Sequence, residues 1–222
     1  MESNKIGDWV IFKTNQFIAF NKPPAVPVQP DKTGEKSLQA LAEIYCKHPV
    51  LLVHRIDMPA SGLVLFANKK SALAAINEQF QNRTVRKLYL AVVKEQPPKT
   101  EDTLVHFLRK NGRTNRSEAF DHEAEGSKKA ELHYKVINQS DNYFLLEIEL
   151  LTGRHHQIRA QLAAIGCPIR GDVKYGFKRS NPDRSIHLHA WKMEFSHPVT
   201  GETVHLEAPL PEGDPVWDAL KF

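Results

Sequence analysis

Two apolar runs of strand length, residues 50–53 and 63–67, enclose nine residues that carry three ionisable side chains. Both runs are rich in Val and Leu, which is typical of buried strands. The enclosed residues 54–62 also contain a proline, a serine and a glycine, which indicate a turn. Charged side chains are costly to hold beside a core unless they pair or take part in chemistry. The turn therefore predicts either a structural ion pair between Arg55 and Asp57 or a functional site.

The composition is that of a globular protein, with 41% hydrophobic and 25% charged residues in a chain of 222. The formal net charge of +4 permits a polyanionic partner without requiring one. Cys46 and Cys167 lie far apart and fit no metal-type spacing, which favours a reducing compartment. No apolar run approaches membrane-spanning length, and the first residues lack the apolar core of a signal peptide. We therefore expect a cytoplasmic protein that is not bound to a membrane.

Apolar patterns predict strands and helices in an irregular order. Strands are expected over residues 9–12, 17–20, 88–93, 103–108, 132–137, 144–150, 187–195 and 203–206. Helices are expected after an N-cap at Ser37, from about Ser71 as N-cap to Asn82, and from about 152 to Gly166. Because strands and helices do not alternate regularly, we predict an α+β fold: a mixed, mainly antiparallel sheet with flanking helices and long loops.

Residues 109–129 form the least apolar stretch of the chain. They begin with a basic group, Arg109, Lys110, Arg113 and Arg116, and continue into an acidic patch. Long polar excursions of this kind are often functional, and this one could be a mobile hairpin. A charge-balanced surface loop and a segment in direct contact with nucleic acid are both open alternatives.

Several chemistries find no support in the residue pattern. The glycines form neither a dinucleotide fingerprint nor a P-loop, and there is no Gly-x-Ser-x-Gly elbow. Histidine pairs at 155–156 and at 187 and 189 could suggest a metal site. However, neighbours on a helix point about 100° apart, and two histidines on one strand face still need a third ligand. We therefore expect no metal ion.

Four motifs, in matching order, resemble those of the RluA-type pseudouridine synthases. Residues 54–62 resemble the family's HRLD-x-x-T/A-S-G motif. The other three are an Asn-Lys-Pro segment, a Lys-x-Tyr-x-Ala strand and a Thr-Gly-Arg-x-His-Gln-Ile/Leu-Arg helix start, at residues 21–24, 87–91 and 152–159. Shorter matches at 171–176, 188–190 and 197–198 extend the resemblance over about residues 17–211. Motifs that agree in kind and in order are far more specific than one alone.

This resemblance implies a pseudouridine synthase fold in one catalytic domain over residues 10–212, without the N-terminal S4-type RNA-binding domain of some relatives. It implies an isomerase that acts on a uridine in rRNA or tRNA. The enzyme would break the glycosidic bond, rotate the base and rejoin it through C5, with neither a metal nor an organic cofactor. RNA is the implied partner, with the target uridine flipped out of its stack, and the protein is expected to be a monomer.

The resemblance also assigns roles to residues. Asp57 is the expected nucleophile or charge stabiliser, acting at ribose C1′ or on the base. Arg159 matches the family's arginine that pairs with this aspartate, and Tyr89 matches the tyrosine that stacks on uracil and helps remove the C5 proton. The residues expected to contact the RNA substrate are His54, Arg55, Arg154, His155, His156 and Gln157.

Gln161 departs from the family pattern, because many members carry a histidine at that position. It lies one helical turn from Gln157 and holds no catalytic role, so we expect activity to persist. The main alternative is a non-catalytic RNA-binding or RNA-chaperone protein on the same fold, which the intact Asp57, Tyr89 and Arg159 disfavour. A basic domain that binds an acidic protein has no positive support. No residue selects the RNA or the uridine.

Overall fold

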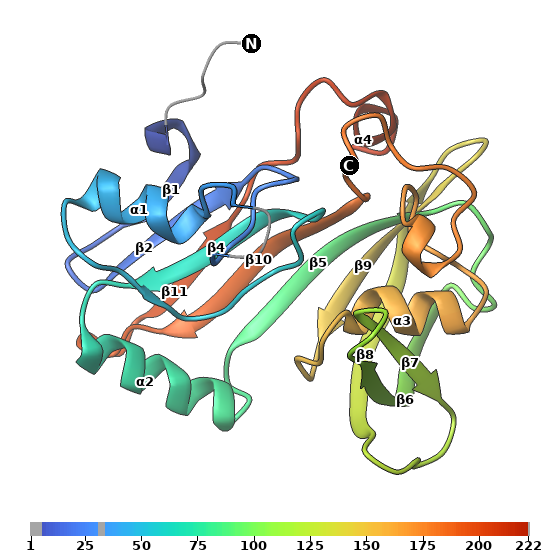
Figure 1. The fold of residues 1–222 in the computed structure, drawn as a ribbon, viewed down its shortest axis with the longest axis horizontal. Helices are drawn as coiled ribbons and strands as arrows, with labels where there is room; N and C mark the ends of the chain where they lie inside the picture. The colour runs from blue at the N-terminus through green and yellow to red at the C-terminus, as the bar shows by residue number, and fades with distance from the viewer. Residues whose placement is uncertain (1–5, 31–33, 222) are drawn as a thin grey trace. The chain divides into compact units, whose positions relative to one another are not determined.

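The fold is taken from a computed structural model that describes residues 6–30 and 34–221 (Figure 1). Residues 1–5, which open the segment searched for a signal peptide, lie outside the described residues. The chain forms two compact units. Unit 1 comprises the described residues up to Arg86 together with His189–Leu210, and unit 2 comprises Lys87–Leu188 together with the described residues from Pro211 onward. The expected single catalytic domain over residues 10–212 stays a prediction.

Unit 1 contains a mixed sheet in the order β1-β2-β4-β10, with β3 paired to β4 and β11 paired to β10. Strands β4 and β10 are parallel and the other pairs are antiparallel. The strands are β1 (Val10–Lys13), β2 (Phe17–Lys22), β3 (Leu51–Leu52), β4 (Ser61–Ala67), β10 (Leu188–Ser196) and β11 (Thr203–Glu207). The 3₁₀-helix η1 (Ile6–Trp9) precedes β1. The predicted mixed, mainly antiparallel sheet is confirmed.

The two predicted apolar runs around the charged turn behave differently. β4 is buried along its whole length, as expected for residues 63–67. β3, in contrast, is only two residues long and half-buried. The predicted strand over residues 50–53 is therefore confirmed only at Leu51 and Leu52, which pair with Ala67 and Phe66 of β4, and of the four residues only Val50 is buried.

The helices of unit 1 are α1 (Leu38–Cys46) and α2 (Lys70–Gln81). α1 begins as predicted, since Ser37 Oγ accepts the N–H of Ala40. α2 begins two residues earlier than expected, because its N-cap position is Lys69 rather than Ser71, and Ser71 lies inside its first turn. Lys69 makes no side-chain capping bond, and the preceding Asn68 is held by hydrogen bonds to the carbonyls of Gln16 and Thr14. No helix within residues 6–30 and 34–221 is long and apolar enough to cross a membrane.

Unit 2 contains an antiparallel sheet in the order β5-β9-β8-β6-β7. Its strands are β5 (Arg86–Val93), β6 (Glu101–Asn111), β7 (Arg116–Phe120), β8 (Lys128–Gln139) and β9 (Phe144–Leu150), and its helices are α3 (Gln157–Ala164) and α4 (Pro215–Ala219). β9 matches the prediction. β6 and β8 extend beyond their apolar cores, because their polar ends continue the hydrogen-bonded ladder between the two strands.

The polar excursion at residues 109–129 contains a regular hairpin. β6 and β7 pair antiparallel from Phe107 opposite Phe120 to Asn111 opposite Arg116. The Arg109 guanidinium bonds to Glu118 across the hairpin at 3.0 Å and lies over the ring of Phe120. α3 packs against β6 and β7 (Figure 1). We call β6, β7 and their turn the basic hairpin.

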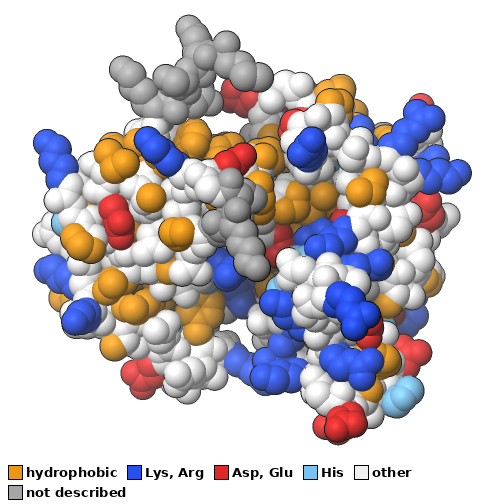
Figure 2. All heavy atoms as spheres, in the orientation of Figure 1, with side chains coloured by type: hydrophobic (Ala, Val, Ile, Leu, Met, Phe, Trp, Pro, Cys, Tyr) orange, Lys and Arg blue, Asp and Glu red, His pale blue; other side chains and the backbone are white. Residues whose placement is uncertain are grey.

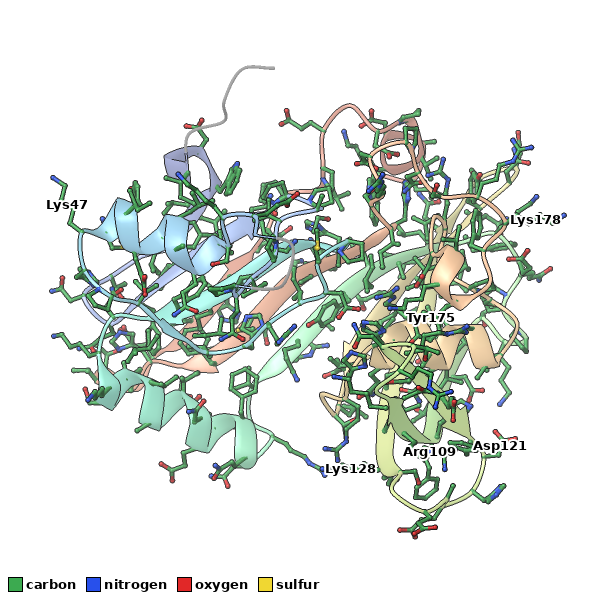
Figure 3. The ribbon with its side chains drawn as sticks, viewed as in Figure 1. Lys47, Arg109, Asp121, Lys128, Tyr175 and Lys178 are labelled. Atoms are coloured by element: carbon green, nitrogen blue, oxygen red, sulfur yellow. The ribbon has the colours of Figure 1, made fainter. Side chains whose placement is uncertain are left out.

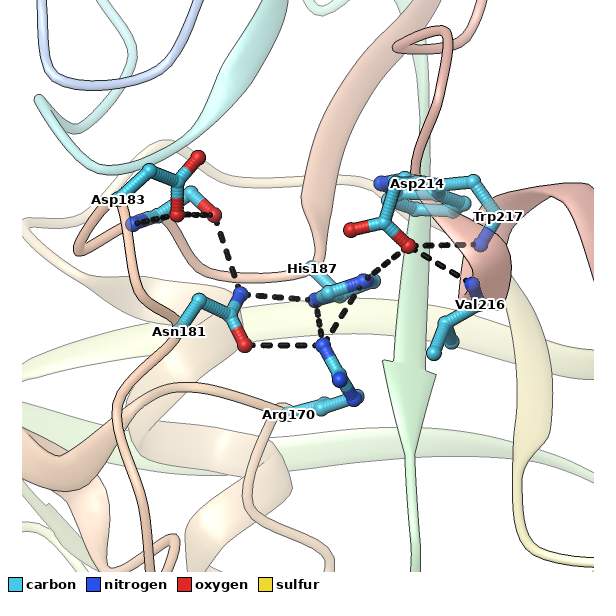
Figure 4. Close-up of polar contacts among 8 residues, drawn as sticks. Arg170, Asn181, Asp183, His187, Asp214, Val216 and Trp217 are labelled. Atoms are coloured by element: carbon cyan, nitrogen blue, oxygen red, sulfur yellow. Dashed lines mark hydrogen bonds and ion pairs between the residues drawn. The ribbon is translucent and has the colours of Figure 1, made fainter.

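A polar network around His187 anchors the C-terminal segment of unit 2 (Figure 4). The His187 ring is buried, and its Nε2 lies 3.1 Å from Oδ1 of Asp214. Its Nδ1 accepts a hydrogen bond from the side-chain amide of Asn181 at 3.1 Å. Arg170 Nη1 lies 3.1 Å from both ring nitrogens. Trp217 stacks on the ring at 5.3 Å between centroids. Burial lowers the pKa of His187 below its usual value, so the ring is neutral at pH 7.

His187 and His189 therefore do not form the strand pair considered from the sequence. His187 precedes β10 and belongs to unit 2, whereas His189 lies on β10 in unit 1. The periodicity of two holds only inside a strand, and β10 begins between them at Leu188. Each histidine has its own buried hydrogen-bond partners, which give it a structural role.

Candidate active site

Asp57 lies in the loop of residues 53–60 that connects β3 to β4 in unit 1. Backbone contacts close this loop: Val53 N–H donates to the carbonyl of Leu65 at 3.2 Å, and the carbonyl of Asp57 accepts the N–H of Ala60 at 3.1 Å. The Asp57 side chain is half-buried. The loop therefore holds a carboxylate at a defined place that solvent can still reach.

His54 and Arg55 begin the same loop and differ in exposure. His54 is half-buried, and its Nε2 accepts the N–H of Leu65 at 3.2 Å, which ties the loop to β4. Arg55 is exposed. The structure thus supports a structural task for His54 and leaves the Arg55 side chain accessible, while contact of either residue with RNA stays a prediction.

Lys22, at the end of β2, holds the loop from the side of the sheet. Its side chain is fully buried, and Nζ donates to the carbonyls of Pro23 at 2.9 Å and Met58 at 3.1 Å. Met58 also accepts the N–H of Ala25 at 3.0 Å. Burial lowers the pKa of Lys22 to about 7, and the nearby charge of Asp57 opposes this shift. The Lys22 ammonium group is therefore close enough to the Asp57 carboxylate for their charges to interact.

The sequence had placed Lys22 in a matched motif without assigning it a role. The available signal was a lysine that follows an apolar strand and Asn21 and stands immediately before two prolines. A lysine is almost never fully buried unless it has specific partners. The identity of those partners, two backbone carbonyls, required the structure.

The loop re-enters the sheet at Ser61 and Gly62. The Ser61 hydroxyl bonds to Nδ1 of His189 at 2.8 Å, and Nε2 of His189 bonds to the carbonyl of Ala208 at 3.1 Å. Since a carbonyl only accepts, Nε2 carries the proton and Nδ1 accepts from Ser61. Burial lowers the pKa of His189 to about 4. Gly62 has φ +107°, and a Cβ there would lie 2.3 Å from the carbonyl oxygen of Ala190, so only glycine fits.

Tyr89 belongs to unit 2, on β5, opposite Ile148 of β9. Its side chain is 8% exposed. The predicted buried strand is confirmed. Its expected roles, stacking on uracil and proton removal at C5, stay predictions.

The segment before α3 departs from the expected helix start. α3 begins at Gln157, not near residue 152 as expected, so Arg154 lies outside the helix that carries Arg159. The reason is the Gln157 side chain, whose Oε1 accepts from the Thr152 hydroxyl at 2.8 Å and from the Arg154 N–H at 3.0 Å. These bonds hold residues 152–156 in a compact loop.

Gln157 is 3% exposed, and its Nε2 donates to the carbonyl of Glu131 on β8 at 3.0 Å. Its polar atoms thus join the loop to the sheet, which supports a structural role, while contact with RNA stays a prediction. The Arg154 side chain is exposed and donates from Nε to the carbonyl of Lys129 at 3.0 Å. Arg154 therefore remains available to a ligand at the surface.

His155 and His156 also lie outside the helix. Their rings stack at 3.9 Å between centroids with 19° between planes, so the 100° separation expected for helical neighbours is wrong. The cause is His156, the N-cap residue, which adopts a left-handed conformation with φ 51°. In the part of the chain that the structure describes, no group of three or more His, Cys, Asp or Glu side chains could hold a metal ion.

Arg159 lies on α3 and is 4% exposed. Its Nε and Nη2 donate to the two carboxylate oxygens of Asp172 at 2.7 and 2.9 Å, a bidentate pair in which Asp172 is 1% exposed. Tyr175 also lies against the guanidinium, with its ring centroid 5.0 Å from the central carbon. Asp172 and Tyr175 belong to a matched segment to which the sequence gave no role. Because Asp57 belongs to unit 1 and Arg159 to unit 2, their pairing stays a prediction.

Gln161, the residue that departs from the family pattern, is fully buried. Its Nε2 donates to the carbonyl of Leu104 at 3.0 Å and lies 3.1 Å from Nδ1 of His106. Both partners belong to β6. Gln161 therefore ties α3 to the basic hairpin.

Lys and Arg side chains gather over the basic hairpin in Figure 2, and Figure 3 labels Arg109 on β6 of this hairpin and Lys128 on the neighbouring strand β8. Lys110, Arg113 and Arg116 are exposed. Arg109 pairs with Glu118, and Asp121, Glu123 and Glu125 are exposed on the same excursion, so a charge-balanced loop and nucleic-acid contact both stay open.

The family profile described as RNA pseudouridylate synthase matches residues 16–164. The chain is 32% identical to an uncharacterized RNA pseudouridine synthase of Bacillus subtilis (strain 168), over 91% of this chain and 68% of that protein. It is also 32% identical to ribosomal large subunit pseudouridine synthase C of Rickettsia prowazekii, over 92% of this chain and 68% of that protein. The chain spans about two thirds of the length of these curated relatives.

Solved structures share the fold. The human RNA pseudouridylate synthase domain containing 1 superposes with a TM-score of 0.79 at 25% identity, covering 95% of this chain and 87% of that one. The human RNA pseudouridylate synthase domain containing 4 has a TM-score of 0.76 at 23% identity, covering 93% and 90%. The α+β fold predicted from the sequence is thereby confirmed.

Proposed function

Because the chain belongs to the RluA-type family of RNA pseudouridine synthases, which are isomerases, we propose that it converts a uridine in ribosomal or transfer RNA to pseudouridine. The N1–C1′ bond breaks, the uracil rotates, and C5 bonds to C1′. C5 loses its proton and N1 gains one, so the product is an isomer of the substrate. The observation that carries this proposal is the position of the Asp57 carboxylate. Its loop is fixed by backbone hydrogen bonds of Val53 and Ala60 and by the bond of Lys22 to the carbonyl of Met58.

Asp57 acts as the nucleophile in this proposal. A carboxylate that attacks C1′ or the base must be ionised and must keep its position while the base leaves. The bonds of Lys22 to Met58 and of Ser61 to His189 support that positional demand.

Tyr89 and Arg159 complete the proposed catalytic set. The Tyr89 ring would stack on the uracil, and its hydroxyl would assist removal of the C5 proton. Arg159 would pair with Asp57 while Asp172 holds the same guanidinium through Nε and Nη2. Such an arginine would keep the carboxylate oriented as charge develops.

The RNA substrate must present a flipped-out uridine, because C1′ and C5 are not both accessible in a stacked base. We propose that the exposed cations Arg55 and Arg154 and those of the basic hairpin contact phosphates. His54, His155, His156 and Gln157 would support these contacts by holding the loops that carry the arginines. The protein would act as a monomer in the cytoplasm.

The test is tritium release from total rRNA and tRNA labelled with 5-³H-uridine. We expect release by the wild-type chain and a loss of at least about 10³-fold in Asp57→Asn, because the amide cannot act as a nucleophile. Asp141→Asn, at an exposed position of unit 2, is the matched control and should keep full activity. EDTA should leave the rate unchanged, since no metal is required.

An RNA-chaperone function gives a different result. The wild-type chain would then bind and anneal RNA without releasing tritium from any fraction, which would overturn the enzyme proposal. Equal release by the wild type and Asp57→Asn would instead remove Asp57 from its role. Mapping pseudouridines in rRNA and tRNA from cells with and without the protein would identify the target.

A further inference from the structure

Tyr175 lies where three segments of unit 2 meet (Figure 3). Its hydroxyl oxygen accepts the N–H of Ser117 on β7 at 2.7 Å and lies 3.0 Å from Nδ1 of His156, in the loop before α3. Since the oxygen accepts from Ser117, the same hydroxyl can also donate its proton to Nδ1 of His156. The ring centroid lies 5.0 Å from the guanidinium carbons of both Arg116 and Arg159.

Ser117 strengthens the same connection from the side of the hairpin. Its hydroxyl donates to the carbonyl of His155 at 2.5 Å and lies 3.0 Å from Nδ1 of that residue. The Ser117 side chain is 5% exposed, so these bonds are shielded from water. Shielded hydrogen bonds are costly to leave unmade, which makes this junction a rigid one.

An open groove of about 520 Å³ lies along the contact between the basic hairpin and α3. It is lined by Asn111, Arg116, Glu118, Ala160, Ala163 and Tyr175 among others. Arg116 is exposed at this groove and lies over the buried ring of Tyr175. A phosphate that binds Arg116 therefore reaches a side chain in direct contact with Tyr175.

We propose that Tyr175 is a positioning residue that couples the basic hairpin to Arg159, so that RNA held by the hairpin also sets the position of the guanidinium paired with Asp172. This inference rests on the proposed function. The Tyr175 hydroxyl fixes the hairpin by accepting a hydrogen bond from Ser117. The Tyr175 ring makes cation–π contacts with Arg116 of the hairpin and with Arg159.

Two substitutions separate the hydroxyl from the ring. Tyr175→Phe removes the bonds to Ser117 and His156 and keeps the ring, so we expect KM for labelled tRNA to rise about 5–10-fold while kcat changes less than about 2-fold. Tyr175→Leu also removes the ring beside Arg159, so kcat should fall about 10-fold or more. The matched control is Tyr143→Phe, in the same unit, whose ring lies 5.4 Å from the guanidinium carbon of Arg170. It should leave both parameters unchanged.

A cycle with Arg116→Ala tests the coupling itself. If the hairpin acts through Tyr175, the KM effects of Arg116→Ala and Tyr175→Phe should be clearly less than additive. Full additivity would overturn the coupling. A loss of thermal stability in Tyr175→Phe with unchanged kcat and KM would also overturn it, because the residue would then be only structural.

A measurement that needs no catalysis separates this inference from the proposed function. The Nε–H resonance of Arg159 should shift when a short uridine-containing stem–loop RNA is added to the wild-type chain. It should shift much less in Tyr175→Phe at equal saturation. If no tritium is released but this difference is seen, the enzyme proposal fails and the coupling stands. If the shifts are equal in the two proteins, the coupling fails whatever the activity.

Discussion

The two segments that carry the proposed catalytic charges are held in different ways. The Asp57 loop of unit 1 is held mainly through main-chain groups, since Lys22 and His54 both bond to the backbone. Arg159 of unit 2 is held by side chains, the carboxylate of Asp172 and the ring of Tyr175. A main-chain contact survives most substitutions at the residue that supplies it, whereas a side-chain contact is lost with one change.

The difference extends to how each unit buries a cation. Lys22 has carbonyl oxygens as its hydrogen-bond partners, and burial lowers its pKa to about 7. Arg159 has a buried carboxylate as its partner and keeps its charge, because arginine does not deprotonate in proteins. The stability that depends on Lys22, beneath the Asp57 loop, should therefore change with pH. The stability that depends on Arg159 should instead change when its partner Asp172 is substituted.

The largest effect is expected from Asp172→Asn, which leaves the buried Arg159 guanidinium without its counter-charge. Breaking a buried ion pair in this way costs about 3–5 kcal/mol, measurable by urea unfolding. Asp218→Asn is the control, because it removes an exposed pair with Lys221 in the same unit and should cost less than about 1 kcal/mol. Equal losses in the two variants would contradict the importance of burial.

The next effect is the pH dependence that Lys22 contributes. Its folded pKa of about 7 lies below the ordinary 10.5, so the unfolded state binds more protons between these values and stability rises with pH. From pH 7 to 9.5 this contributes about 3 kcal/mol to the free energy of unfolding, which Lys22→Met should lack. Lys47→Met, at an exposed lysine labelled in Figure 3, should keep the wild-type slope. If the free energy of unfolding of Lys22→Met rose with pH in parallel with that of the wild type, Lys22 would not have the lowered pKa on which this prediction rests.

A third effect should appear on acidification, through His189. Its pKa falls from 6.5 to about 4 on folding, so its contribution is present above pH 6.5 and is lost as the pH falls toward 4. Between pH 7 and 5 the loss is about 2 kcal/mol. The free energy of unfolding of His189→Gln should therefore fall by about 2 kcal/mol less than that of the wild type between pH 7 and 5. His205→Gln, at an exposed histidine of β11, should retain the wild-type profile.

The smallest effect is expected at the C-terminal segment. Asp214 accepts the N–H groups of Val216 and Trp217 at the start of α4 and bonds to His187. Asp214→Ala should cost about 1 kcal/mol, the usual cost of a lost N-cap. Faster amide exchange at Trp217, with β9 unchanged, would localise the loss to α4. Slower or unchanged exchange there would show that the cap does not hold the segment.

Local patterns predicted most of the elements and the position of Asp57. The alternation in β9 and the Ser37 cap of α1 were both predicted correctly, because each depends only on residues within a few positions. The start of α3 was not, since the Gln157 side chain competes for the backbone of Arg154 and thereby prevents an earlier helix turn. The strand at residues 50–53 was overestimated because apolar composition does not reveal how many residues of a run pair with a neighbouring strand.

The sequence by itself determined the fold class, the family and the residues proposed for catalysis, because periodicity and ordered motifs are written in consecutive positions. Only the tertiary structure decided what holds those residues: Lys22 beneath Met58, Asp172 against Arg159, and Tyr175 between the basic hairpin and α3. These partners are separated by 36, 13 and 58 positions. Which distant groups meet depends on how strands pair and helices pack, and no local propensity encodes that choice.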